Sequence, residues 1–353
     1  MDVYIILLIC VLVSILFQKY TNKFNTRIKK SINIIISLFL LLVLVGVYSL
    51  RDNIGYDYAM YIRTIEEGYA NDIYASKGEI FSAALLNFAG FLGEPHIYFF
   101  LVALISFILI IYSLNKYIEV SNGLGWGILC FLAIPIGFIV TLDVQRQFVA
   151  MAILVFATRY LILRSFIKYF FCIVLACFFH ISSIFYICIY FITSSKFKYK
   201  YFIILLLFGY IISYIGVNLL VNIFPFYEEY LTTFSSEGGF LQITVYVVWG
   251  IIFLGIKKYM KNYYNYNIFL KTYLWGLIMI VSLMPLFNSV QVVVRLGGVA
   301  LMNLIFLIPY LFYAFKNYKW MVEILTILIL SFMYIYALLV TVPGFFIPYK
   351  TFM

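Results

Sequence analysis

The sequence predicts an all-α polytopic membrane protein, and its composition and apolar runs support this. Hydrophobic residues fill 66% of the 353 positions, charged residues fill 11%, and the mean hydropathy is +1.07. A soluble domain of this length has too little interior to bury so much apolar surface, whereas helices in a bilayer expose it to lipid. No hydrophilic stretch is long enough for a separate soluble domain, so we expect a single integral membrane domain over 1–353.

Charge and cysteine content exclude several other classes of protein. The formal net charge is +10, but basic residues in a membrane protein mark its cytoplasmic loops, so we expect no nucleic-acid partner. The five cysteines lie in apolar runs, which is typical of buried side chains and not of disulfides or metal ligands. The sequence has no phosphate-binding loop, nucleophile elbow or dinucleotide fingerprint, and we predict neither a metal site nor a cofactor.

Apolar segments long enough to cross a bilayer predict about ten transmembrane helices. Two further apolar stretches are harder to place, because 80–92 is short and 169–192 is interrupted at His180. Both can form re-entrant or short helices beside the membrane-spanning ones. The ten segments lie at about 3–17, 32–50, 97–114, 124–142, 147–163, 201–223, 241–256, 269–288, 296–315 and 320–342.

Basic clusters predict the orientation through the positive-inside rule. The cluster between residues 19 and 30 places the first loop in the cytoplasm, so the loop 51–79 lies outside. The clusters at 159–168 and 196–200 both belong inside, although only one apolar stretch separates them. We therefore expect 169–192 to turn back near His180 as a re-entrant pair of half-helices. Such backbone is tolerated at membrane depth only where it is buried in protein or lines a polar cavity.

Six of the 24 basic residues fall on the outer side, where they do not anchor the topology. Arg146 and Arg295 each open an apolar segment at the same predicted depth. Because guanidinium groups grip phosphate oxygens bidentately, we predict that the two clamp a diphosphate, with Arg51 as a third candidate. A structural alternative for Arg146 is a simple ion pair with Asp143. The six outer cations are Arg51, Arg63, Lys77, Arg146, Arg295 and Lys350.

The outer loop 51–79 carries a candidate catalytic acid and candidate aromatic platforms for sugars. Asp57 and Tyr61 are four residues apart, so they share one face of a helix. Asp57 is a candidate general base, and Tyr58 and Tyr61 are candidate sugar-binding residues. The alternative is a solvated outer loop without a catalytic role.

Two further sequence positions carry candidate functional groups. His180 lies at the predicted helix break and is a second candidate for acid–base catalysis, although a lone histidine in an apolar run is also typical of a protein core. Tyr349 and Lys350 follow the last apolar segment and are candidate sugar-binding residues. A simple anchor at the membrane interface is the alternative for this tail.

Several stretches, taken together and in order, resemble the EpsG family. Residues 51–58 resemble its R-x-x-x-G-x-D-Y signature, residues 146–150 its R-Q-x-x-A segment, and residues 179–182 its F-H-x-S segment. Arg295 and the closing residues 348–350 also fit the family pattern. The resemblance covers essentially the whole chain.

The sequence departs from that family pattern at two positions. Tyr56 stands where threonine is common, and Ile181 stands where proline is common. The first change alters the hydroxyl groups offered beside Asp57, and the second removes a residue that would itself favour a helix break.

The resemblance implies a GT-C-like membrane glycosyltransferase, similar to the Wzy-type polymerases of surface polysaccharides. Such an enzyme joins polyprenyl-diphosphate-linked oligosaccharide repeat units into a capsule, exopolysaccharide or O-antigen at the outer face of the bacterial cytoplasmic (inner) membrane. Its partners would be that lipid-linked substrate and membrane lipids, with a chain-length regulator as a further candidate. We expect no metal requirement, because arginines can neutralise the leaving diphosphate.

Three alternatives to this polymerase stay open at the level of the sequence. An O-antigen-ligase-like transferase would attach a finished glycan to a different acceptor. A GT-C enzyme that uses a sugar on a lipid monophosphate would favour a metal at Asp52 and Asp57, and sensitivity to EDTA would separate it. A lipid-glycan flippase would need polar residues along a path to the inner leaflet.

Overall fold

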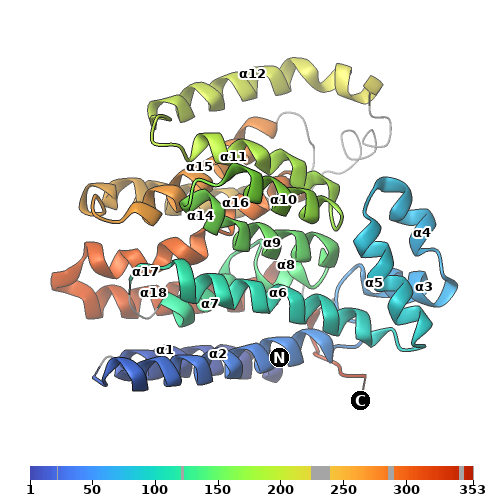
Figure 1. The fold of residues 1–353 in the computed structure, drawn as a ribbon, viewed down its shortest axis with the longest axis horizontal. Coiled ribbons are helices and arrows are strands. Elements are labelled where there is room, and N and C mark those ends of the chain that lie inside the picture. Colours follow the sequence, from blue (N-terminus) through green and yellow to red (C-terminus); the bar gives the residue numbers. More distant parts are fainter. Residues whose placement is uncertain (22, 121–122, 224–238, 285–289, 342–345, 353) are drawn as a thin grey trace.

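The protein is built from helices throughout the part that the structure describes. The computed structural model describes residues 1–21, 23–120, 123–223, 239–284, 290–341 and 346–352 (Figure 1). Within these ranges there is no strand, and the only β-type pairing is an isolated bridge between Arg51 and Thr351. The predicted all-α polytopic class is confirmed.

The N-terminal half forms the lower part of the bundle in Figure 1 and a small cap at its right end. Helix α1 packs against α2 and α7, and α6 contacts both α2 and α9. The helices of this half are α1 (Asp2–Thr21), α2 (Thr26–Ser49), α3 (Tyr58–Glu67), α4 (Ala70–Ile73), the 3-10 turn η1 (Ala75–Lys77), α5 (Ile80–Phe91), α6 (His96–Tyr117), α7 (Gly123–Ala133), α8 (Phe138–Thr141) and α9 (Gln145–Ile162).

The C-terminal half completes the bundle, with α15 contacting α12, α14 and α16, and α17 contacting α7. Its elements are α10 (Phe166–Cys177), the 3-10 helix η2 (Ile181–Ile187), α11 (Cys188–Ile192), α12 (Lys200–Ile223), α14 (Gly239–Ile256), η4 (Lys257–Tyr259), α15 (Tyr264–Leu283), α16 (Val290–Leu301), α17 (Leu304–Ala314), η5 (Lys316–Tyr318), α18 (Lys319–Tyr336) and the π-helical turn η6 (Ala337–Thr341). The predicted segment ends at 288 and 342 lie outside the described residues.

Fewer described helices than the predicted ten could cross a membrane alone. Six are long and apolar enough, or seven if the bent pair α16–α17 is one span. Helices α5, α7 and α10 are apolar but shorter. The difference arises because a long apolar run in the sequence need not be one helix: the predicted segment 124–142 divides into α7 and α8.

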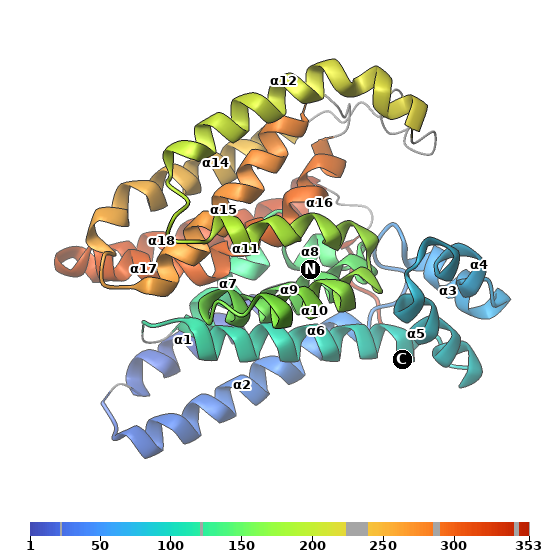
Figure 2. The ribbon, with the colours of Figure 1, turned by 45° about the horizontal axis from the view of Figure 1, so that its top comes forward.

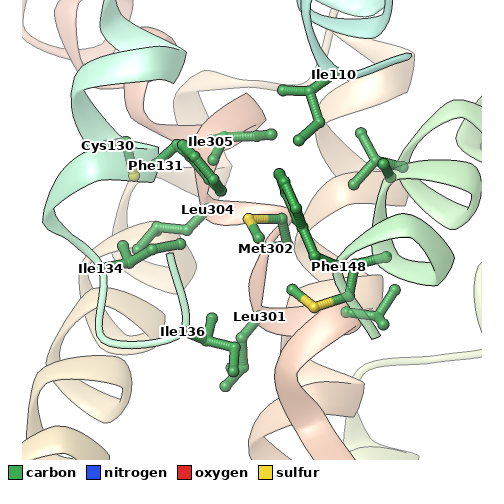
Figure 3. Close-up of a cluster of buried hydrophobic side chains, with 14 of the residues drawn as sticks. Ile110, Cys130, Phe131, Ile134, Ile136, Phe148, Leu301, Met302, Leu304 and Ile305 are labelled. Atoms are coloured by element: carbon green, nitrogen blue, oxygen red, sulfur yellow. The ribbon is translucent and has the colours of Figure 1, made fainter. Parts of the chain in front are cut away.

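Two interrupted helices share one buried core beneath the outer loop. Residues 134–137 separate α7 from α8, and α16 meets α17 at an angle of 50°. Figure 3 shows Ile134, Ile136, Leu301 and Met302 from these interruptions around Phe148 of α9. This packing fixes the start of α9, which carries Arg146, against the end of α16, the helix that carries Arg295.

The segment that follows α9 turns back on itself at His180. Helix α10 ends at Cys177, and the chain returns as η2 and α11, which pack beside it. The Tyr169 hydroxyl donates to the Tyr186 carbonyl at 2.9 Å, and the Arg164 guanidinium donates to the Tyr190 carbonyl at 2.9 Å. These hydrogen bonds join α10 and the turn before it to η2 and α11 in a closed hairpin. The hairpin has the shape predicted for the pair of half-helices.

The loop 51–79 forms a small cap at one end of the bundle. It contains α3, α4 and η1, and with α5 it lies on the right of Figures 1 and 2, near the C-terminus. At the start of α5, the backbone amide of Phe81 donates to the Phe178 carbonyl at 3.1 Å. The Ser82 hydroxyl donates to the Phe179 carbonyl at 2.9 Å. The cap therefore rests on the tip of the hairpin.

Candidate active site

Glu79 joins three elements at the junction of the cap, the hairpin and α9. One carboxylate oxygen accepts a hydrogen bond from the Arg146 guanidinium in an ion pair. The other lies 3.1 Å from His180 Nδ1 and accepts the backbone amide of Ile181 at 3.2 Å. Only 3% of the Glu79 side chain is exposed. A buried carboxylate with these three partners is fully compensated.

The environment of Glu79 keeps its carboxylate charged. Burial alone would raise its pKa, but the hydrogen bond from His180 and the charge of Arg146 outweigh burial and hold the pKa below its usual value. Since an ionised carboxylate only accepts hydrogen bonds, His180 donates from Nδ1. In the neutral ring, Nε2 is then the basic nitrogen and can take a proton from a substrate hydroxyl.

Arg146 begins α9 and is held on several sides. Its guanidinium lies 4.2 Å from the centre of the Tyr74 ring, and the Tyr61 hydroxyl lies beside it. It pairs with Glu79 and not with Asp143, so the structural alternative offered by the sequence named the wrong partner. About 21% of the Arg146 side chain is exposed, so one edge remains accessible.

Arg295 lies on α16 and differs from Arg146 in its charge balance. Among the described residues, its guanidinium has no hydrogen bond or ion pair. Its backbone carbonyl accepts a hydrogen bond from the Gln147 side chain at 2.6 Å, which ties α16 to the start of α9. An accessible arginine without a direct ion-pair partner is suited to bind an anion.

Asp57 lies close enough to both arginines for their charges to act on its carboxyl group. Burial raises the pKa of the Asp57 carboxyl group, while the charges of Arg295 and Arg146 act to lower it. The structure thus brings together Asp57, Arg146 and Arg295, three of the site residues predicted from the sequence. A half-buried carboxylate of raised pKa beside two cations can act as a general base or orient a hydroxyl group.

The loop that carries Asp57 is fixed by Asp143. The backbone amide of Tyr56 donates to Asp143 Oδ1 at 2.7 Å. Gly55 adopts φ +102°, and a Cβ atom there would lie 2.6 Å from the same oxygen. Burial raises the pKa of Asp143 to about 6. The glycine of the R-x-x-x-G-x-D-Y stretch is therefore needed for this close contact.

Arg51 lies below the site and corrects an expectation from the sequence. Its side chain is fully buried, and it donates to the Tyr48 carbonyl at 2.9 Å and to the Leu142 carbonyl at 3.0 Å. The guanidinium also lies 4.9 Å from the Phe99 ring centre. Because protein encloses it, Arg51 is not placed to contact a diphosphate and instead supports the loop.

The predicted aromatic platforms also prove to be internal. Tyr58 is 4% exposed, and its hydroxyl lies 3.2 Å from Asp52 Oδ1, whereas Tyr61 is 1% exposed. Neither ring offers a face to a sugar. Tyr56 and Tyr69 of this loop are exposed instead, at 54% and 51%. Aromatic residue type alone did not distinguish the packed rings from the exposed ones.

The C-terminal tail contacts α2, the start of the outer loop and the start of α6. The Tyr349 hydroxyl donates to the Val47 carbonyl at 2.7 Å, and the amide of Asp52 donates to the Lys350 carbonyl at 2.9 Å. The ring of Phe352 stacks on His96 at 3.7 Å. Tyr349 is thus occupied by a structural contact, while the Lys350 side chain is exposed.

A cavity of about 260 Å³ opens beside the charged cluster. Tyr56, Asp143 and Arg295 contribute polar groups to its wall, and most of its other lining side chains are apolar. Within the described ranges, no three His, Cys, Asp or Glu side chains lie close enough to hold a metal ion. The site thus combines arginines, carboxylates and a histidine with an adjoining apolar space.

An all-α polytopic bundle with this cluster defines a membrane protein whose candidate active site lies at one end of its helices. The family model of the EpsG family matches residues 34–351, nearly the whole chain. The chain therefore belongs to the EpsG family, a family of Wzy-like polysaccharide polymerases. No curated protein and no solved structure matches it.

Proposed function

We propose that the protein polymerises polyprenyl-diphosphate-linked oligosaccharide repeat units into a surface polysaccharide. The reaction takes place at the outer face of the bacterial cytoplasmic membrane, and a capsule, exopolysaccharide or O-antigen is the product class. The observation that carries the proposal is that the guanidinium of Arg295, which has no direct ion-pair partner among the described residues, acts on Asp57 together with Arg146 at one end of the bundle. Membership of the EpsG family supports the polymerase class.

The proposed reaction is a glycosyl transfer between two lipid-linked units. The acceptor hydroxyl oxygen bonds to the anomeric carbon of the donor sugar as the bond from that carbon to the diphosphate oxygen breaks. Polyprenyl diphosphate leaves as an anion, and Arg295 and Arg146 stabilise its developing charge without a metal. The acceptor's proton passes to His180 Nε2 or to the Asp57 carboxylate.

His180 is the better placed of the two bases, because Glu79 holds its ring through Nδ1. Hydrolases use the same arrangement, in which a histidine base is hydrogen-bonded to a carboxylate through its other ring nitrogen. The carboxylate orients the ring and stabilises its protonated form. Asp57 then orients the acceptor hydroxyl between the two arginines.

Reconstitution with a lipid-diphosphate-linked repeat unit as sole substrate tests the proposal. We expect a ladder of products on a gel, with or without EDTA. Arg295→Ala should lower the rate by at least about 100-fold, the effect of removing one charge-stabilising donor. Arg63→Ala is the matched control. The side chain of that outer arginine is 78% exposed, and its ion pair with Glu67 is long, at 3.8 Å.

Other outcomes would point to other functions. A ladder that EDTA abolishes would contradict metal-independent chemistry. Transfer of a single glycan to a different acceptor would indicate a ligase-like enzyme. Movement of the lipid across the bilayer without a new glycosidic bond would indicate a flippase. An unchanged ladder in Arg295→Ala would overturn the role of that residue.

A further inference from the structure

The cavity next to Arg295 is polar on one part of its wall and apolar over most of the rest. Its charged residues are Arg295 and Asp143. Its apolar wall comes from five separate parts of the chain: Val140 of α8, Val245 of α14, Val294 of α16, Phe332 of α18, and Phe346 after the last helix. A lining assembled from elements so far apart in sequence is a feature of the whole fold and not of one helix face.

The cavity suits a ligand whose anionic group is attached directly to a hydrocarbon chain. Arg295 has no ion-pair or hydrogen-bond partner in the part of the chain that the structure describes, and it borders this apolar space. A polar ligand such as a sugar would leave its hydroxyl groups without partners against the apolar wall, at a cost in free energy. A free diphosphate would leave the wall unused.

We infer that this cavity binds the isoprene units next to the diphosphate of the lipid carrier. The inference rests on the proposed function for the identity of the carrier. Arg295 binds the diphosphate, and the first isoprene units fill the space lined by Val140, Val245 and Phe332. At about 260 Å³ the cavity is smaller than sites of ~300–1,000 Å³ that enclose a drug-sized ligand. It therefore holds only the part of the chain nearest the head group.

This placement also explains how the donor is oriented. The diphosphate is held by a cation at one end and by its own hydrocarbon chain at the other, so the sugar on its far side faces Asp57 and the Glu79–Arg146–His180 group. The hydrocarbon chain is bound at a distance from the glycosidic bond that breaks. Such a remote contact raises the fraction of bound substrate that is held in a reactive position.

Binding of defined ligands to the purified full chain in nanodiscs tests the inference. The probes are farnesyl diphosphate and inorganic diphosphate. We expect farnesyl diphosphate to bind at least about tenfold more tightly. Val245→Trp, which fills the cavity, should remove this advantage and leave the affinity for inorganic diphosphate unchanged. Val140→Trp fills the same space from another helix and should do the same.

A matched control and a second readout make each outcome decisive. Leu254→Trp places the same ring on α14 at an exposed position outside the cavity and should leave both affinities unchanged. If both filled variants retain the full preference for farnesyl diphosphate, the inference is wrong. It is also wrong if they lose only co-purified phospholipid, since the cavity would then hold a bilayer lipid.

The inference and the proposed function fail in different ways. A cavity that binds farnesyl diphosphate in a protein that forms no polymer from the repeat unit would overturn the proposed function and leave the inference standing. Normal polymer formation by both filled variants, with unchanged affinity for farnesyl diphosphate, would overturn the inference and leave the proposed function standing.

Discussion

Individual side chains in the charged cluster differ in whether their charge is already matched. Arg146 is paired with Glu79, whereas Arg295 has no such partner among the described residues. A paired arginine must give up its carboxylate partner in order to bind a phosphate, which costs free energy. An unpaired arginine binds the phosphate without that cost. We therefore assign the larger share of diphosphate binding to Arg295 and the larger share of positioning to Arg146.

Glu79 should act on catalysis through His180 and Arg146. Glu79→Gln keeps the shape of the side chain but removes its charge, so we expect polymer formation to fall at least about tenfold. His180→Ala should cause a larger loss. Because the two residues act as a unit, the double variant should be no worse than His180→Ala alone. Losses that multiply in the double variant, measured by initial polymerisation rate, would contradict this coupling.

Asp143 should make the stability of the protein depend on pH. Its folded pKa is raised from 3.8 to about 6, mainly by burial, with Asp57 also raising it and Arg295 and Arg51 opposing this. The folded state therefore binds the proton more tightly than the unfolded state, and stability falls as the pH rises from about 4 to about 6. The cost above that window is on the order of 2–3 kcal/mol.

Asp143→Asn removes this cost while its amide oxygen still accepts the amide of Tyr56. We expect the variant to have a higher Tm than the wild type at pH 7.5 and an equal Tm near pH 4, measured in detergent. Asp72→Asn, at an exposed position of the same outer region, should show no such difference. A lower Tm for Asp143→Asn at pH 7.5 would contradict the assignment.

Residue type and position in the sequence predicted only part of this cluster. Arg146 and Arg295 stand out as cations that open apolar segments on the outer side, and the structure places both beside Asp57. Glu79 shows the same pattern before the apolar stretch 80–92, but acidic residues carry little weight in the positive-inside rule, so it was missed. Its pairing with His180, 101 residues away, depends on the tertiary fold.

At the scale of elements, the charge pattern predicted the hairpin turn correctly, whereas the hydropathy pattern missed a helix break. The two inside clusters on either side of 169–192 required a turn near His180, and the hairpin is present. The break between α7 and α8 was missed, although Pro135 and Gly137 mark it. A Cβ atom at Gly137 would lie 1.9 Å from the Phe131 carbonyl. Apolar periodicity does not reveal such a tight turn, because both sides of it are equally hydrophobic.

The hairpin places both of its ends on one side of the membrane, and labelling can test this. In a cysteine-free background we expect Lys168→Cys and Ser195→Cys to react with a membrane-impermeant thiol reagent only after the cells are permeabilised. Ser182→Cys, at the turn, should react from outside. Lys168→Cys and Ser195→Cys on opposite sides would show that the segment crosses the membrane once.

At the scale of the whole molecule, the C-terminal tail lies beside the start of the outer loop that carries Asp57. The tail pairs with the residues that follow α2, through the bridge between Arg51 and Thr351 and the bond from the Phe352 amide to the Leu50 carbonyl at 3.3 Å. The sequence indicated that residues 348–350 belong to the family pattern, but it could not show whether their side chains or their backbone matter. Only the fold brings positions 50 and 352 together.

These contacts separate two roles for the tail. If it binds sugar through its side chains, Lys350→Ala should lower polymer formation. The geometry favours a structural role, because Lys350 contributes a backbone carbonyl that any residue supplies. We therefore expect Lys350→Ala to keep activity within about twofold, since a surface substitution away from special contacts changes stability by only ~0.5 kcal/mol.

Deletion of residues 349–353 removes the Tyr349 hydroxyl bond, the pairing with Asp52 and the stacking of Phe352 on His96. It also leaves the buried backbone beside Arg51 without its partner, so the loop that carries Asp57 loses its support. We expect this truncated protein to be made and inserted but to form little polymer and to have a lower Tm. If instead Lys350→Ala is as inactive as the truncation, the tail contacts the sugar directly, and the side chain of Lys350 belongs to the site.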